Sequence, residues 1–133
     1  MKKIFPILCV FFLLVGCSQK PSDVMPDNTK GVLLSVENVS KIGLTYCITN
    51  DTQDICTYGQ AYSLERKTRD NWYSIDSGKT VYSEAILYTL EPNDKREHAV
   101  SWESRYGSLK TGIYRLLITA NDSLVISAEF SVK

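Results

Sequence analysis

The strongest constraint on this chain is an alternation of apolar and polar side chains with a period of two, which begins near residue 31. It is longest at the C-terminal end, where every second residue from Leu124 to Val132 is apolar. Such an alternation is typical of β-strands that turn one face to a core and the other to water. The same pattern recurs over residues 32–36, 44–48, 86–90 and 114–118.

Turn-forming sequences separate these segments at short intervals. They are rich in Asn, Asp, Ser, Gly and Pro and lie at residues 38–41, 50–54, 68–71, 76–78, 91–94 and 121–123. No segment has a clear helical period, and Ser101–Leu109 has room for one helical turn. The spacing predicts an all-β fold, an antiparallel β-sandwich of about seven to nine short strands.

Length and charge narrow the class of protein. A chain of 133 residues allows one ordinary domain. An apolar share of 44% is too high for a disordered chain. The balance of 15 basic and 15 acidic side chains argues against a strongly basic nucleic-acid binder.

An export signal is present at the N-terminus. Lys2 and Lys3 form a short positive segment, and an almost unbroken apolar run follows over residues 4–15. This order is that of a signal peptide, and the run is too short for a membrane span of about 20 residues.

The end of this run carries a second motif. Residues 14–17 read Leu-Val-Gly-Cys and resemble the bacterial lipobox. The resemblance implies a lipoprotein signal peptide over residues 1–16, removed after Gly16, and diacylglycerol on the thiol of Cys17. The acyl chains would hold the protein on the extracytoplasmic face of the cell membrane. The alternative is an ordinary secretory peptide with an incidental cysteine.

The segment that follows predicts a linker. Residues 17–30 are polar, contain two prolines and have no periodicity, so we expect a lipidated N-terminus and a flexible, solvated tether. Residues 31–133 then form the folded domain. Removing residues 1–16 removes Lys2 and Lys3, which leaves the mature chain mildly acidic and gives no electrostatic case for nucleic acid or for anionic lipid headgroups.

Two cysteines remain in the domain. Cys47 and Cys56 flank a turn-rich stretch, so in an exported protein they predict a disulfide across a hairpin. The alternatives are two free thiols or a metal site, and a metal site would need more ligands than the single histidine, His98, supplies. We expect no metal and no cofactor.

Two further details concern the strand over residues 114–118. A glycine-led turn runs into Tyr114, which resembles the tyrosine corner of Greek-key sandwiches, where the hydroxyl bonds to upstream backbone.

Arg115 and Glu65 lie off the apolar faces of their strands, which predicts an ion pair on the exterior or rim. An exposed pair of this kind contributes less than about 1 kcal/mol.

Two sequence segments are the most specific in the chain: residues 58–65, YGQAYSLE, and residues 102–115, WESRYGSLKTGIYR. Taken in order with other segments of the domain, they resemble one family, the bacterial immunoglobulin-like domain found in small lipoproteins of Gram-positive bacteria. The similarity extends over nearly all of residues 31–133 and implies an Ig-like β-sandwich outside the cell. The family implies no particular reaction.

Catalytic groupings are scarce in the sequence. His98 shares a predicted strand face with Val100 and Trp102, which favours a structural histidine, and no nucleophile elbow is present. We therefore expect a non-enzymatic module that binds an envelope protein or cell-wall ligand. Tyr73, Tyr82 and Tyr106 lie near turns and are candidates for its binding patch. The alternatives are a spacer lipoprotein and an envelope hydrolase that uses His98.

Overall fold

The structure, a computed structural model, describes residues 19–75 and 86–133. These residues form nine β-strands and one helical turn: β1 (Val32–Glu37), β2 (Gly43–Asn50), β3 (Cys56–Gly59), β4 (Ser63–Thr68), β5 (Asn71–Ser74), β6 (Leu87–Leu90), β7 (Lys95–Ser101), α1 (Glu103–Tyr106), β8 (Gly112–Ala120) and β9 (Leu124–Val132). None of the helices in this part of the chain could span a bilayer. The predicted signal peptide, Cys17 and Tyr82 lie outside the described residues.

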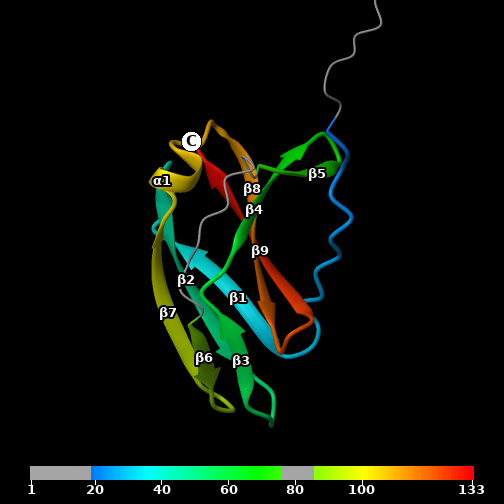
Figure 1. The fold of residues 1–133 in the computed structure, drawn as a ribbon, viewed down its shortest axis with the longest axis vertical. Coiled ribbons are helices and arrows are strands. Elements are labelled where there is room, and N and C mark those ends of the chain that lie inside the picture. Colours follow the sequence, from blue (N-terminus) through cyan, green and yellow to red (C-terminus); the bar gives the residue numbers. More distant parts are fainter. Residues whose placement is uncertain (1–18, 76–85) are drawn as a thin grey trace, which may run out of the picture.

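The strands form two antiparallel sheets. One has the order β1-β2-β7, and the other has the order β5-β4-β8-β3-β6, with β9 paired along the length of β8. Figure 1 shows the two sheets packed against each other, with α1 at one end. The predicted all-β sandwich is confirmed, and the one helical turn lies within the predicted Ser101–Leu109.

The turns follow from residues that tolerate a left-handed backbone. Asn38, Asn93, Asn121 and Asp122 have φ values of 53°, 61°, 49° and 65°, and each lies in a predicted turn. Asn and Asp adopt this conformation more readily than other residues with a side chain, because their short polar groups bond to nearby backbone. The chain therefore turns at the predicted segments 38–41, 91–94 and 121–123, whereas the predicted turn 76–78 lies outside the described residues.

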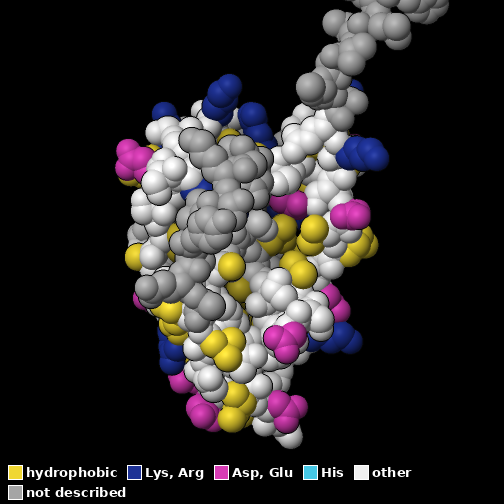
Figure 2. Space-filling model, in the orientation of Figure 1, with side chains coloured by type: hydrophobic (Ala, Val, Ile, Leu, Met, Phe, Trp, Pro, Cys, Tyr) yellow, Lys and Arg dark blue, Asp and Glu magenta, His cyan; other side chains and the backbone are white. Residues whose placement is uncertain are grey.

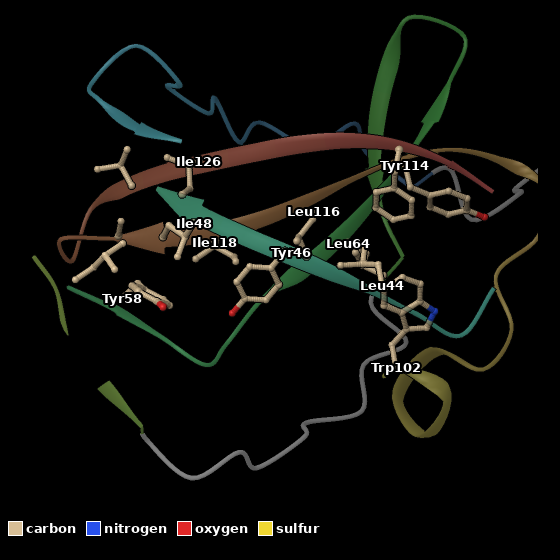
Figure 3. Close-up of a cluster of buried hydrophobic side chains, with 14 of the residues drawn as sticks. Leu44, Tyr46, Ile48, Tyr58, Leu64, Trp102, Tyr114, Leu116, Ile118 and Ile126 are labelled. Carbon is tan, nitrogen blue, oxygen red and sulfur yellow. The ribbon is translucent and has the colours of Figure 1, made fainter. Parts of the chain in front are cut away.

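The core lies between the sheets, where the alternating apolar faces meet. Figure 3 shows Tyr46 and Ile48 of β2 facing Leu116 and Ile118 of β8. Trp102, fully buried, closes one end, and its indole N–H donates to the Lys41 carbonyl at 2.9 Å. Burying side chains of this size contributes about 1.5–3 kcal/mol each.

The tyrosine corner is confirmed. The hydroxyl of Tyr114 donates to the carbonyl of Lys110 at 2.7 Å, and the ring is buried against Phe130 with their centroids 5.7 Å apart. This bond fixes the turn that leads into β8.

Residues 19–28, which we call the strap, differ from the flexible tether that their composition predicts. The amide of Ser22 donates to the Trp72 carbonyl on β5 at 2.7 Å, and the amide of Asp27 donates to the Val125 carbonyl on β9 at 2.8 Å. Ser22, Val24 and Pro26 are half-buried, while Pro21, Asp23 and Met25 are exposed. The strap therefore alternates like a strand and crosses the outer face of the larger sheet, as the blue segment in Figure 1 shows.

The strap changes the setting of the predicted ion pair. Glu65 and Arg115 are cross-strand partners on β4 and β8, and Arg115 Nε donates to Glu65 Oε1 at 2.7 Å. Arg115 also donates to the Val24 carbonyl of the strap at 3.2 Å and lies 4.6 Å from the ring centre of Trp72. The pair forms as predicted, but it is buried, with 4% and 7% of the two residues exposed, and not on the exterior.

The predicted disulfide between Cys47 and Cys56 is absent, and both thiols are free. The expected hairpin is wrong, because β2 and β3 belong to different sheets. Cys56 is buried in the core, whereas Cys47 is half-exposed between the core residues Tyr46 and Ile48, so it lies on the opposite face of β2. Burial raises the pKa of the Cys56 thiol, which keeps it protonated.

Candidate functional site

The single histidine is the centre of an aromatic cluster between the two sheets. His98 on β7 is the cross-strand partner of Tyr46 on β2, and Tyr58 on β3 is the partner of Tyr88 on β6. The two pairs meet across the interior, where the Tyr58 hydroxyl lies 2.7 Å from His98 Nε2. The ring centres of Tyr88 and His98 are 4.6 Å apart. Four strands from two sheets are therefore joined through one imidazole.

The electrostatics of this cluster favour neutral side chains at neutral pH. Burial, followed by the positive charge of Arg96, lowers the pKa of His98 below its ordinary 6.5. Burial raises the pKa values of Tyr46 and Tyr58 above their ordinary 10. In residues 19–75 and 86–133, the hydrogen-bond and ring partners of His98 are tyrosines, which fits the structural role predicted for it.

This arrangement predicts a pH dependence. Because the folded chain has the lower His98 pKa, the unfolded chain binds the proton more readily, and stability falls as the pH drops from about 6.5 through the folded-state pKa. We expect His98→Gln to remove this part of the pH dependence in urea unfolding. The imidazole signal of the one histidine should titrate below 6.5 by NMR, and a midpoint at or above 6.5 would contradict the prediction.

A pocket of about 430 Å³ opens beside this cluster. Its aromatic wall comprises Tyr46, Tyr62, Tyr88 and His98, and Ser104 and Arg105 of α1 lie on its polar side. We call it the aromatic pocket. Tyrosine faces stack on flat apolar groups, and a few polar groups at the rim orient a ligand.

The helical turn α1 positions the arginine of this pocket. Arg105 donates from Nη1 to the Tyr62 carbonyl at 2.9 Å, and its guanidinium lies 4.7 Å and 5.5 Å from the ring centres of Tyr106 and Tyr62. Desolvation by burial raises the pKa of Tyr62, and the nearby Arg105 charge partly opposes this shift. The guanidinium therefore joins α1 to the start of β4 and holds one side of the pocket.

Of the three tyrosines predicted for a binding patch, Tyr73 and Tyr106 lie in the described residues and Tyr82 does not. Tyr73 lies on β5, beside a shallow hollow with Arg66 and Gln19, and Tyr106 packs against the core. The aromatic pocket is lined by other aromatic residues, Tyr46, Tyr62, Tyr88 and His98. Alternation marks Tyr46 and Tyr88 as inward-facing, but their meeting with His98 depends on the pairing of strands far apart in the chain.

A second hollow of about 530 Å³ lies on the outer face of the larger sheet. Val24 of the strap, Leu117 of β8 and Val125 of β9 form its apolar wall. It has no histidine, arginine or lysine among its lining residues. The aromatic pocket therefore carries more of the chemistry that recognises a ligand. In the described parts of the chain, no three His, Cys, Asp or Glu side chains are grouped to hold a metal ion.

Two antiparallel sheets, a buried tryptophan and a tyrosine corner define an immunoglobulin-like sandwich. The sequence profile of the family described as "Bacterial Ig-like domain" matches residues 30–131. The chain belongs to this family, as the resemblance predicts. No curated protein matches the sequence as a relative. Domains of this family are generally non-catalytic, and the fold is typical of an interaction module.

Proposed function

We propose that this protein is a lipid-anchored, extracytoplasmic interaction module of the bacterial cell envelope. The observation that carries the proposal is the order of two parts: a Leu-Val-Gly-Cys sequence that resembles a lipobox and ends at Cys17, and, after a short segment, a bacterial Ig-like domain over residues 30–131. The lipid would hold the domain at the outer surface of the cell membrane, and the domain would bind an envelope protein or a cell-wall ligand.

The aromatic pocket supports binding as the role of the domain. Tyr62 and Tyr88 line this pocket, and tyrosine rings pack against aromatic side chains and against the apolar faces of sugars. The strap weakens the case for a spacer. Contacts of Gln19 with Ser74 and of Ser22 with Trp72 leave little free chain between Cys17 and the domain.

A retention experiment tests the interaction. The mature chain from residue 17, with Cys17→Ser to omit the lipid, is immobilised and exposed to an extract of the cell envelope. We expect one partner to be retained, and Ser104→Trp to reduce its retention at least tenfold by filling the aromatic pocket. Ser104 is exposed on α1, so the substitution leaves the core intact.

Ser108→Trp is the matched control, because Ser108 is also exposed and lies outside the pocket. It should retain the partner as the unmodified chain does. Equal loss with both variants would reject the pocket as the binding site. Retention of nothing by the unmodified chain would reject the interaction module.

A further inference from the structure

The charged side chains of this nearly neutral chain separate to opposite ends of the sandwich. One end comprises the β4–β5 turn, α1 and the C-terminal end of β9, and we call it the basic end. Among the described residues, its exposed or half-exposed basic side chains are Lys20, Lys41, Arg66, Lys67, Arg69, Arg105, Lys110 and Lys133. Glu37, Asp70 and Glu103 are the acidic side chains at this end within residues 19–75 and 86–133. Figure 2 shows dark blue side chains gathered at the upper end of the molecule.

The far end has the opposite composition. It comprises the β2–β3, β6–β7 and β8–β9 turns, which are held together by hydrogen bonds such as that from the Asn50 amide to the Asp94 carbonyl at 2.9 Å. Its turns carry the exposed carboxylates Asp51, Asp54, Glu91, Asp94 and Asp122. Lys30, Lys95 and Arg96 are its basic side chains. The magenta side chains at the bottom of Figure 2 belong to this end.

The N-terminal chain reaches the domain at the basic end. Gln19 donates to the Ser74 carbonyl of β5, and β5 follows directly from the β4–β5 turn. Figure 1 shows the described chain beginning beside β5, at the upper end of the molecule. Cys17 is two residues before Gln19, and an extended chain spans at most about 3.6 Å per residue. A lipid on Cys17 would therefore place this end within about 7 Å of the bilayer surface.

We propose that the basic end is a docking surface for an anionic phospholipid bilayer, which orients the domain with its acidic end away from the membrane. The inference rests on the proposed lipid anchor for its geometry. Each lysine or arginine close to an anionic membrane strengthens binding about fivefold, and the attraction falls off within a Debye length of about 8 Å. The same membrane would repel the acidic far end if that end approached it. The separation of charge therefore orients the domain, although the net charge of the chain favours no orientation.

The backbone at the basic end is held while its lysine side chains stay exposed. The carbonyl of Lys41 accepts from the Trp102 indole and from the Leu109 amide, and the carbonyl of Lys110 accepts from the Tyr114 hydroxyl. Replacing these lysine side chains leaves all three bonds in place. The charges can therefore be removed without altering the fold.

Vesicle binding tests the basic end in a chain that lacks the lipid anchor on Cys17. The mature chain with Cys17→Ser is mixed at low salt with vesicles of phosphatidylglycerol and phosphatidylcholine, and with vesicles of phosphatidylcholine alone. We expect co-sedimentation with the anionic vesicles only, and its loss at high salt. Lys41→Gln with Lys110→Gln should weaken this binding at least about tenfold.

Lys30→Gln with Lys95→Gln is the matched control, because it removes the same charge from the far end and should change binding less than about twofold. Equal weakening by both pairs, or equal binding to both vesicle types, would overturn the proposal. Retention on heparin beads without vesicle binding would assign the basic end to a soluble polyanion and would also overturn it. All of these measurements use the chain without the lipid anchor, so their outcome does not depend on whether Cys17 is acylated. Mass spectrometry of the mature N-terminus tests the anchor separately.

Discussion

Replacing Cys17 by alanine is expected to move the protein from the membrane fraction to the soluble fraction almost completely. The sulfur of Cys17 is the atom to which the diacylglycerol would be attached, and alanine offers no substitute. Each buried methylene of an acyl chain contributes about 0.8 kcal/mol to anchoring. A protein with two acyl chains is therefore held stably on the membrane, and a protein without acyl chains is not. Detergent-phase partitioning of the whole-cell extract and the mass of the mature N-terminus measure the effect.

Cys9→Ala is the control for this prediction. Cys9 lies within the apolar run of the predicted signal peptide and outside the Leu-Val-Gly-Cys motif. The variant should be acylated and membrane-bound like the unmodified protein. An unmodified protein without acyl mass, or a Cys17→Ala protein that still enters the detergent phase, would reject the anchor.

Replacing Arg115 by alanine is expected to destabilise the domain by about 3–5 kcal/mol, because the carboxylate of Glu65 stays buried without its cation. The substitution also removes the hydrogen bond to the Val24 carbonyl and the contact with Trp72. Since domains of this size have about 5–15 kcal/mol of stability in total, the loss is a large fraction. Urea unfolding, followed by tryptophan fluorescence, measures it.

A double variant separates the buried charge from the lost contacts. Glu65→Leu with Arg115→Leu removes both charges, so it should be more stable than Arg115→Ala alone. Lys41→Ala, at an exposed position, should change the free energy of unfolding by less than about 0.5 kcal/mol. If Arg115→Ala lowers the free energy of unfolding by less than about 1 kcal/mol, water reaches Glu65 and Arg115 in solution and the strap does not cover them.

Sequence reasoning succeeds here where the determinant is local. The period of two over residues 124–132 predicts a strand that is present as β9, and the turn residues Asn93 and Asn121 adopt the left-handed backbone that their side chains tolerate. The bond of Tyr114 to Lys110 spans four residues, so the local motif suffices to predict it.

The expected hairpin between the cysteines and the expected tether differ from the structure for one reason. Both depend on which residues from distant parts of the chain become neighbours in the fold. The cysteines flank a short turn, but that turn carries the chain from one sheet to the other, so the expected hairpin does not form. Residues 17–30 were expected to be a tether because they are polar, contain two prolines and have no periodicity. Their amides at Ser22 and Asp27 nevertheless find carbonyl partners on β5 and β9, which no local pattern reveals.

The sequence by itself determined the β-sandwich, its turns in the described residues and the family, since each depends on residue spacing along the chain. Only the tertiary structure decided that Glu65 and Arg115 are buried, that His98 joins tyrosines of both sheets, and that the charges separate to two ends. The physical reason is that burial and electrostatic potential depend on every group within several ångströms, and strand pairing and sheet packing bring those groups together from across the chain.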